Sequence, residues 1–135
     1  MSRTSVLSLD MRSLELGPRR TELRRTLVAA VLRGEKIATA SLREDYEPDT
    51  EEAMSRPGER LMLLGFDDEP LGLVQIGAAK VVRAADVDVQ FARDEGEGFK
   101  TVSDWRAAHE RAWADRLITD DTLIVCEWFT LVERY

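Results

Sequence analysis

A turn between a helix-like and a strand-like segment places two reactive side-chain types close together. The sequence RGEKIATAS carries an ammonium at Lys36 and a hydroxyl at Thr39. Residues three apart point to opposite faces of a regular strand. A shared site therefore requires Lys36 to lie in the turn and Thr39 to face inward, and Gly34 makes such a turn easy. We expect the two groups to meet at the mouth of a cavity, with Arg33 and Ser41 as ligand-binding residues at its edge.

Two roles are open to Lys36. A neutral amine would be a base that activates the Thr39 hydroxyl as a nucleophile. A charged ammonium would instead hold a phosphate or carbonyl oxygen. The carboxyl end of a helix and a nearby carboxylate both favour the cation, so the charged form is expected in the absence of substrate. The alternative without any site is a surface lysine beside a threonine that suits a strand.

Carboxylates follow on a stretch that contains two glycines. Glu95 and Glu97 flank Gly96 in the sequence FARDEGEG, which we expect to be a flexible loop. A carboxylate here can act as a general acid or base, or accept a hydrogen bond from an amino group on a nucleobase. Ordinary solvated loop charge would give the same pattern.

Aromatic residues recur at helical spacing beyond this loop. Trp105, His109 and Trp113 are four residues apart and lie on one face of an expected helix. Such a stripe either packs a core or provides a platform on which bases stack, bordered by Arg106. Tyr46, which follows the first strand, is also expected at the mouth of the pocket.

The secondary structure must bring these segments together. Helical periodicity predicts a helix over about residues 20–33, with Thr21 as its N-cap, and a second helix from Thr101 to about Arg116. Strands are expected at 37–42, 60–66, 71–82 and 122–132, with the middle two joined as a hairpin. Strands this few, curved and hydrophobic tend to close on themselves. The sequence therefore predicts an α+β fold, with a small β-barrel flanked by helices.

Length and composition limit the class of protein. The 135 residues fit one domain at 20–135, with 1–19 as an N-terminal extension that packs on it. No apolar run is long enough for a membrane helix, and no signal peptide is expected. The only cysteine, Cys126, excludes an internal disulfide and suits the cytoplasm. No P-loop, dinucleotide fingerprint or histidine-rich motif occurs, so no metal and no cofactor is expected.

The charge is acidic overall and uneven along the chain. A net charge of -7 argues against a protein that coats nucleic acid through bulk electrostatics. Residues 19–36 nevertheless concentrate arginine and lysine, either as a local basic face or as a solvated helix surface. Residues 44–52 carry acidic side chains without a basic one, which would suit a basic protein partner.

Three motifs together resemble the ASCH domain. GEKIATASL resembles the signature turn of that family, LGLVQI its central strand, and FARDEGEG its later signature, at residues 34–42, 71–76 and 91–98. Thr101, Trp105 and His109 follow the last motif. The resemblance covers roughly residues 20–133. It implies a PUA-like β-barrel, a fold associated with RNA binding.

The family resemblance also implies a set of functional residues. Some members are similar to amidohydrolases acting on acetylated cytidine nucleosides, and others have been linked to RNA cleavage. In the amidohydrolase branch a lysine, a threonine and a downstream glutamate do the chemistry, and these match Lys36, Thr39 and Glu95. The chain departs from that branch in its longer N-terminus and in Trp105 and His109, and looks more like the larger bacterial members.

The resemblance thus implies a cytoplasmic domain that binds single-stranded RNA or a modified nucleoside through a polar pocket at the barrel mouth. The alternative is a hydrolase, either a nucleoside amidohydrolase or a ribonuclease, that uses the same three residues. The sequence leaves the oligomeric state open.

Overall fold

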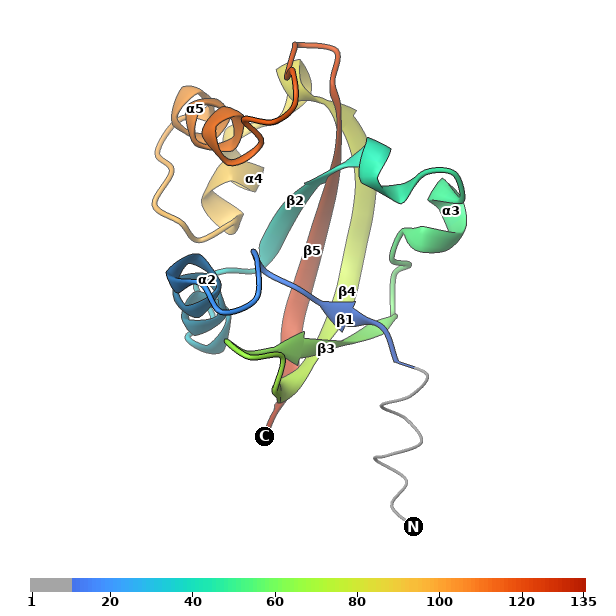
Figure 1. Cartoon of the computed structure of the whole chain (residues 1–135), viewed down its shortest axis with the longest axis vertical. Coiled ribbons are helices and arrows are strands. Elements are labelled where there is room, and N and C mark those ends of the chain that lie inside the picture. The colour runs from blue at the N-terminus through green and yellow to red at the C-terminus, as the bar shows by residue number, and fades with distance from the viewer. Residues whose placement is uncertain (1–10) are drawn as a thin grey trace.

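The computed structural model describes residues 11–135 as a curved five-stranded sheet with helices packed beside it (Figure 1). The strand order is β1-β3-β4-β5-β2. β1 pairs with β3 in parallel, and the other neighbours are antiparallel. The strands are β1 (Ser13–Leu14), β2 (Ala38–Leu42), β3 (Arg60–Leu64), β4 (Pro70–Arg83) and β5 (Leu123–Arg134). The α+β class is therefore confirmed.

The helices begin and end with recognisable caps. They are α2 (Glu22–Leu32), α3 (Thr50–Ala53), α4 (Val89–Asp94) and α5 (Val102–Ala112), with 3-10 turns at Arg43–Tyr46 and Ala84–Asp86. Thr21 caps α2 as predicted, because its hydroxyl accepts a hydrogen bond from the Arg24 N–H at 3.1 Å. Gly34 follows α2 with a φ of 79°. Among residues 11–135, no helix has the length and apolar character needed to cross a bilayer.

Helix α5 ends earlier than the sequence predicts. It stops at Ala112 rather than near Arg116, and Trp113 leaves the helical conformation with a ψ of 35°. The Trp113 ring packs edge-on against the rings of Trp105 and His109. Tertiary packing of this ring thus accompanies the end of the helix.

The expected barrel is not closed. β1 and β2 are the two edges of the sheet, and within the described residues they do not pair with each other. β1 is two residues long and pairs with β3 alone among the described strands. The gap between β1 and β2, called the seam below, is lined by side chains instead.

Each face of the sheet carries its own apolar core. Side chains alternate along β5, so Phe129 joins one core while Ile124 and Cys126 join the other. The first core lies inside the curve of the sheet against α2, and it includes Leu14 and Leu16 from the N-terminal segment. The second core packs α4 and α5 against the outer face. The site described next lies near the start of β2, where these two layers approach each other.

Candidate functional site

One cavity of about 400 Å³ collects the three side chains expected to do chemistry. We call it the Lys36 cavity. Its polar wall includes Lys36, Thr39, Glu95, Glu97 and His109, and its apolar wall includes rings and aliphatic side chains from α2, α5 and the segment before α2. A volume of this size is within the usual range for small-ligand pockets.

Lys36 is buried, with 2% of its surface exposed. Its Nζ donates to the backbone carbonyl of Glu95 at 3.2 Å and to Oε2 of Glu97 at 3.2 Å. These acceptors suit an ammonium, which has three N–H donors. One donor remains after the two bonds to described residues, and it is available to a ligand.

Local backbone contacts place Lys36 at this position. The N–H groups of Glu35 and Lys36 both donate to the Ala30 carbonyl, at 2.9 and 3.1 Å, so the chain turns tightly after α2. The Ile37 N–H then donates to the Asp94 carbonyl at 2.9 Å, which ties the start of β2 to the end of α4. Lys36 lies in the turn, and Thr39 follows on the strand, as the sequence required.

Glu95 lies at the end of a helix rather than on the flexible loop that was expected. It is the C-cap of α4, its N–H donates to the Phe91 carbonyl at 3.1 Å, and only 1% of its surface is exposed. The sequence signal of two glycines was misleading, because Gly96 follows the helix as its left-handed residue, with a φ of 69°. The backbone of Glu95 is therefore fixed at a helix end, and its side chain is buried.

His109 faces Glu95 from α5. Its Nε2 lies 3.2 Å from Oε2 of Glu95. No other described residue donates a hydrogen bond to Oε2. The Nδ1 atom of His109 lies 2.8 Å from the Trp105 carbonyl. A carbonyl only accepts, so Nδ1 carries a proton. If the ring were neutral and Glu95 ionised, two lone pairs would face each other, so we infer that a proton lies between Nε2 and Oε2.

Glu97 completes the polar wall. Burial raises the pKa of its carboxyl, the Lys36 ammonium opposes that effect, and the nearby Glu95 carboxylate adds to it. The side chain is partly open to solvent, unlike that of Glu95. The cavity thus holds two carboxyl groups, one amine and one imidazole that interact directly.

Aromatic side chains divide between the core and the cavity. Trp105 has 0% of its surface exposed and stacks beneath His109, with ring centroids 4.2 Å apart. It does not line the Lys36 cavity, so the expected role as a stacking platform does not hold for Trp105. Phe99 and Trp113 line the cavity instead, and both pack against His109. Phe99 was missed because nothing in its local pattern distinguishes it.

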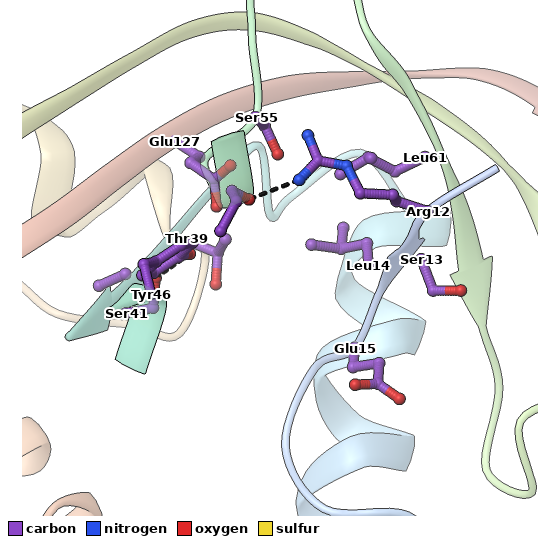
Figure 2. Close-up of a pocket in the computed structure, with 12 residues that line it drawn as sticks. Arg12, Ser13, Leu14, Glu15, Thr39, Ser41, Tyr46, Ser55, Leu61 and Glu127 are labelled. Atoms are coloured by element: carbon purple, nitrogen blue, oxygen red, sulfur yellow. Dashed lines mark hydrogen bonds between the residues drawn. The ribbon is translucent and has the colours of Figure 1, made fainter. Parts of the chain in front are cut away.

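A second cavity of about 550 Å³ lies in the seam, and we call it the seam cavity. Ser41 and Tyr46, expected at the mouth of the first pocket, line this one, and their hydroxyl groups are hydrogen-bonded at 2.7 Å. Burial raises the pKa of Tyr46. Figure 2 shows the Arg12 guanidinium on the side of the cavity where Ser55 and Glu127 lie, with Glu15 beyond the end of β1.

Glu127 is the buried acid of the seam cavity. It projects from β5, and 5% of its surface is exposed. Burial raises the pKa of its carboxyl, while a hydrogen bond with Ser55 and the charge of Arg12 act in the opposite direction. Sequence reasoning missed Glu127, although a lone acid in an apolar strand is a usable signal.

Two expected ligand-binding arginines lie elsewhere. Arg33 is exposed and pairs with Glu35 at 3.0 Å. Arg106 pairs with Glu110 at 3.0 Å and with Asp120 at 3.1 Å. Neither lines the Lys36 cavity.

The acidic segment 44–52 is partly neutralised by a distant arginine. Arg116 contacts Glu44 at 3.1 Å and Asp45 at 2.8 Å. The sequence alone shows no basic residue within this segment. Its partner comes from the turn after α5, about seventy residues away in the chain.

Comparison with known proteins agrees with the fold. The family model described as the ASCH domain matches residues 15–133. An ASCH domain from Lactobacillus crispatus superposes with a TM-score of 0.77 at 24% identity, covering 99% of this chain and 87% of that one. A protein from Enterococcus faecalis gives 0.79 at 23% identity, covering 98% and 86%. No curated protein matches the sequence.

Proposed function

The chain belongs to the ASCH domain family, and on that premise we propose that it binds a modified nucleoside with the base in the Lys36 cavity. The observation that carries the proposal is a buried ammonium, fixed by Glu97 and the Glu95 carbonyl, beside the Glu95–His109 pair. Such a constellation offers both donors and acceptors at one end of a pocket with apolar walls. A flat heterocycle with polar edges has the complementary shape and chemistry.

The charges around the cavity favour a neutral ligand over a phosphate. Lys36 is faced by Glu95 and Glu97, and Glu15 lies on the same wall. These carboxylates would repel a phosphate, whereas an uncharged base experiences no such repulsion. The nucleoside is therefore the better-supported ligand.

The arginine-rich segment gives no additional support to RNA binding. Each arginine between residues 19 and 33 contacts an acidic side chain. Exposed pairs of this kind contribute little stability, but they reduce the positive potential that attracts a phosphate backbone.

Substitution of the buried lysine tests the binding proposal. Lys36→Met keeps a similar size and removes the charged donor, so affinity for N4-acetylcytidine should fall by about 10- to 100-fold. Isothermal titration calorimetry measures the loss, with circular dichroism to verify folding. Lys80→Met is the matched control, because Lys80 lies outside the cavity, near Trp128. Unchanged affinity in the folded Lys36→Met variant would exclude Lys36 from ligand binding.

A hydrolase is the second candidate function. The observation that favours it is that Thr39 lines the same cavity as Lys36 and the Glu95–His109 pair. A neutral Lys36 amine would take the proton of the Thr39 hydroxyl as its oxygen attacks an acyl carbonyl, and the amine that leaves would take a proton from the pair. Water would then attack the acyl group and give its proton to the pair, while Lys36 returns a proton to the Thr39 oxygen and a carboxylic acid is released.

Two substitutions separate hydrolysis from binding. Thr39→Ala should abolish release of acetate from N4-acetylcytidine, and Lys36→Arg should keep ligand binding while abolishing release. Acetate is measured by chromatography alongside calorimetry on the same preparations. Full turnover in Lys36→Arg would rule out Lys36 as the base, and binding without turnover by the unmodified chain would leave only the binding function.

A further inference from the structure

The two cavities adjoin each other, because Glu15, Thr39 and Ala40 line both, and together they are called the groove below. We propose that the seam cavity binds the sugar of the nucleoside and that Glu127 accepts hydrogen bonds from its hydroxyl groups. This inference rests on the proposed function, because it assumes that the base occupies the Lys36 cavity. It adds the class of ligand: an unphosphorylated ribonucleoside.

The two halves of the groove have different linings. The Lys36 cavity presents aromatic rings and leucines in addition to its charged groups. The seam cavity presents hydroxyl groups and carboxylates, from Ser13, Thr39, Ser41, Tyr46, Ser55, Glu15 and Glu127. Hydroxyl-rich walls with a carboxylate suit a polyol, and a carboxylate that accepts from ribose hydroxyls is common in nucleotide-binding folds. The lining of the Lys36 cavity therefore suits a base, and the lining of the seam cavity suits its sugar.

The strand register places Glu127 beside the junction of the two cavities. Thr39 is the cross-strand partner of Glu127 in the β2–β5 ladder, so their side chains lie on the same face of the sheet. Thr39 belongs to both cavities. A carboxylate has about four acceptor positions, and the hydrogen bond with Ser55 uses one of them. Glu127 thus retains acceptor capacity toward the groove.

The open edge of β2 adds backbone groups to the same wall. The Phe129 N–H donates to the Ile37 carbonyl at 2.9 Å, which identifies the odd-numbered residues of β2 as those bonded to β5. The N–H and carbonyl of Ala40 therefore point into the seam. Both a donor and an acceptor are then available to a ligand lying along this edge.

A 5′-phosphate is disfavoured in the seam. Glu15 and Glu127 both line it. Arg12, the cation of this cavity, is engaged by Glu59 at 2.6 and 2.8 Å and by the Ala53 carbonyl at 2.5 Å. A phosphate would have to compete with these partners while approaching carboxylates.

Calorimetry with four matched ligands tests the sugar site. The ligands are N4-acetylcytidine, its 2′-deoxy form, its 5′-monophosphate and the free base N4-acetylcytosine. The unmodified chain should bind the ribonucleoside about tenfold more tightly than each of the other three. Glu127→Gln should lower the affinity for the ribonucleoside about tenfold and leave the affinity for the free base unchanged. Glu133→Gln, on an exposed part of β5, is the control and should match the unmodified chain.

The outcomes separate this inference from the proposed function. If the chain binds the free base as tightly as the ribonucleoside, or if Glu127→Gln leaves all four affinities unchanged, the sugar site is wrong and the base site stands. If Lys36→Met leaves nucleoside affinity unchanged while Glu127→Gln reduces it, the base site is wrong. If none of the four ligands binds, both proposals fail.

Discussion

At the residue scale, the central feature is a buried carboxylate that faces the only histidine of the chain. The Trp105 carbonyl fixes a proton on Nδ1 of His109, and we infer a second proton between Nε2 and Oε2 of Glu95, which lie 3.2 Å apart. This contact holds the Glu95 carboxyl in the wall of the Lys36 cavity, so His109 is a positioning residue for Glu95.

Nitrogen NMR detects this arrangement directly, because the single histidine needs no assignment. In the unmodified chain, Nδ1 should carry a proton, and Nε2 should show the shift of a nitrogen that shares a proton with the Glu95 carboxyl. In Glu95→Gln, the carboxyl is lost and only Nδ1 should keep its proton. A neutral ring protonated at Nε2 in the unmodified chain would contradict the geometry.

The second residue-scale prediction concerns stability and pH. Burial raises the pKa of Glu127, so the folded state holds this proton to a higher pH than the unfolded state. Stability should therefore fall as pH rises from the unfolded pKa through the raised folded value. Glu127→Gln removes that loss. Its unfolding temperature should exceed that of the unmodified chain at pH 7, and the gain should shrink toward pH 4.

Thermal unfolding followed by circular dichroism at both pH values measures the difference, with Glu133→Gln as the control. A lower unfolding temperature for Glu127→Gln at pH 7 would contradict the prediction. The same substitution is expected to weaken ribonucleoside binding. Stabilisation together with lost affinity cannot be attributed to unfolding.

At the element scale, the site depends on how closely the end of α4 packs on the turn after α2. Gly96 has a φ of 69°, and a Cβ built on it would lie 2.3 Å from the Glu35 carbonyl oxygen and 2.6 Å from Cα of Lys36. Gly34 also has a positive φ, of 79°, but a Cβ there meets nothing within 4 Å. The two glycines thus differ in crowding and share the same backbone requirement.

This contrast supplies a matched pair of substitutions. Gly34→Ala should cost about 1–2 kcal/mol through the left-handed conformation alone. Gly96→Ala adds a backbone clash, so its cost should be larger by roughly 1–3 kcal/mol, and nucleoside binding should weaken as Glu95 and Glu97 move from Lys36. Urea unfolding measures both variants. Equal losses in the free energy of unfolding would show that the contact between α4 and the turn contributes little to stability.

At the scale of the whole molecule, charge decides which ligands can approach. The chain carries a net charge of -7, and the arginines of residues 19–33 are paired with acids. Long polyanions gain affinity by releasing counterions from contacts with unpaired cations. A neutral nucleoside does not depend on that effect.

Salt dependence should therefore distinguish the ligand classes. Affinity for N4-acetylcytidine should change less than about twofold between 50 and 300 mM salt, whereas backbone binding falls steeply over such a range. Calorimetry at several salt concentrations, with a ten-nucleotide single-stranded RNA for comparison, makes the measurement. If the RNA binds more tightly than N4-acetylcytidine and with a steep salt dependence, RNA and not the nucleoside is the preferred ligand.

Local patterns in the sequence determined much of the architecture. The periodicity and cap of α2, the glycine after it and the β3–β4 hairpin are all short-range features, and the structure confirms them. The placement of Lys36 in a turn and Thr39 on the next strand also followed from local spacing. The family motifs then selected Glu95 as the third residue, and all three line one cavity.

Only the tertiary structure decided how the sheet ends and which distant groups meet. Within residues 11–135, β1 and β2 do not pair with each other, and no local periodicity in the sequence indicates this. The burial of Glu127 and its position across from Thr39 depend on strand pairing between residues far apart in the chain. The contact of His109 with Glu95 likewise depends on α5 packing against α4. Residue propensity and spacing determine structure only over a few neighbouring residues. Cavities instead form where segments from distant parts of the chain pack together and leave space between their side chains.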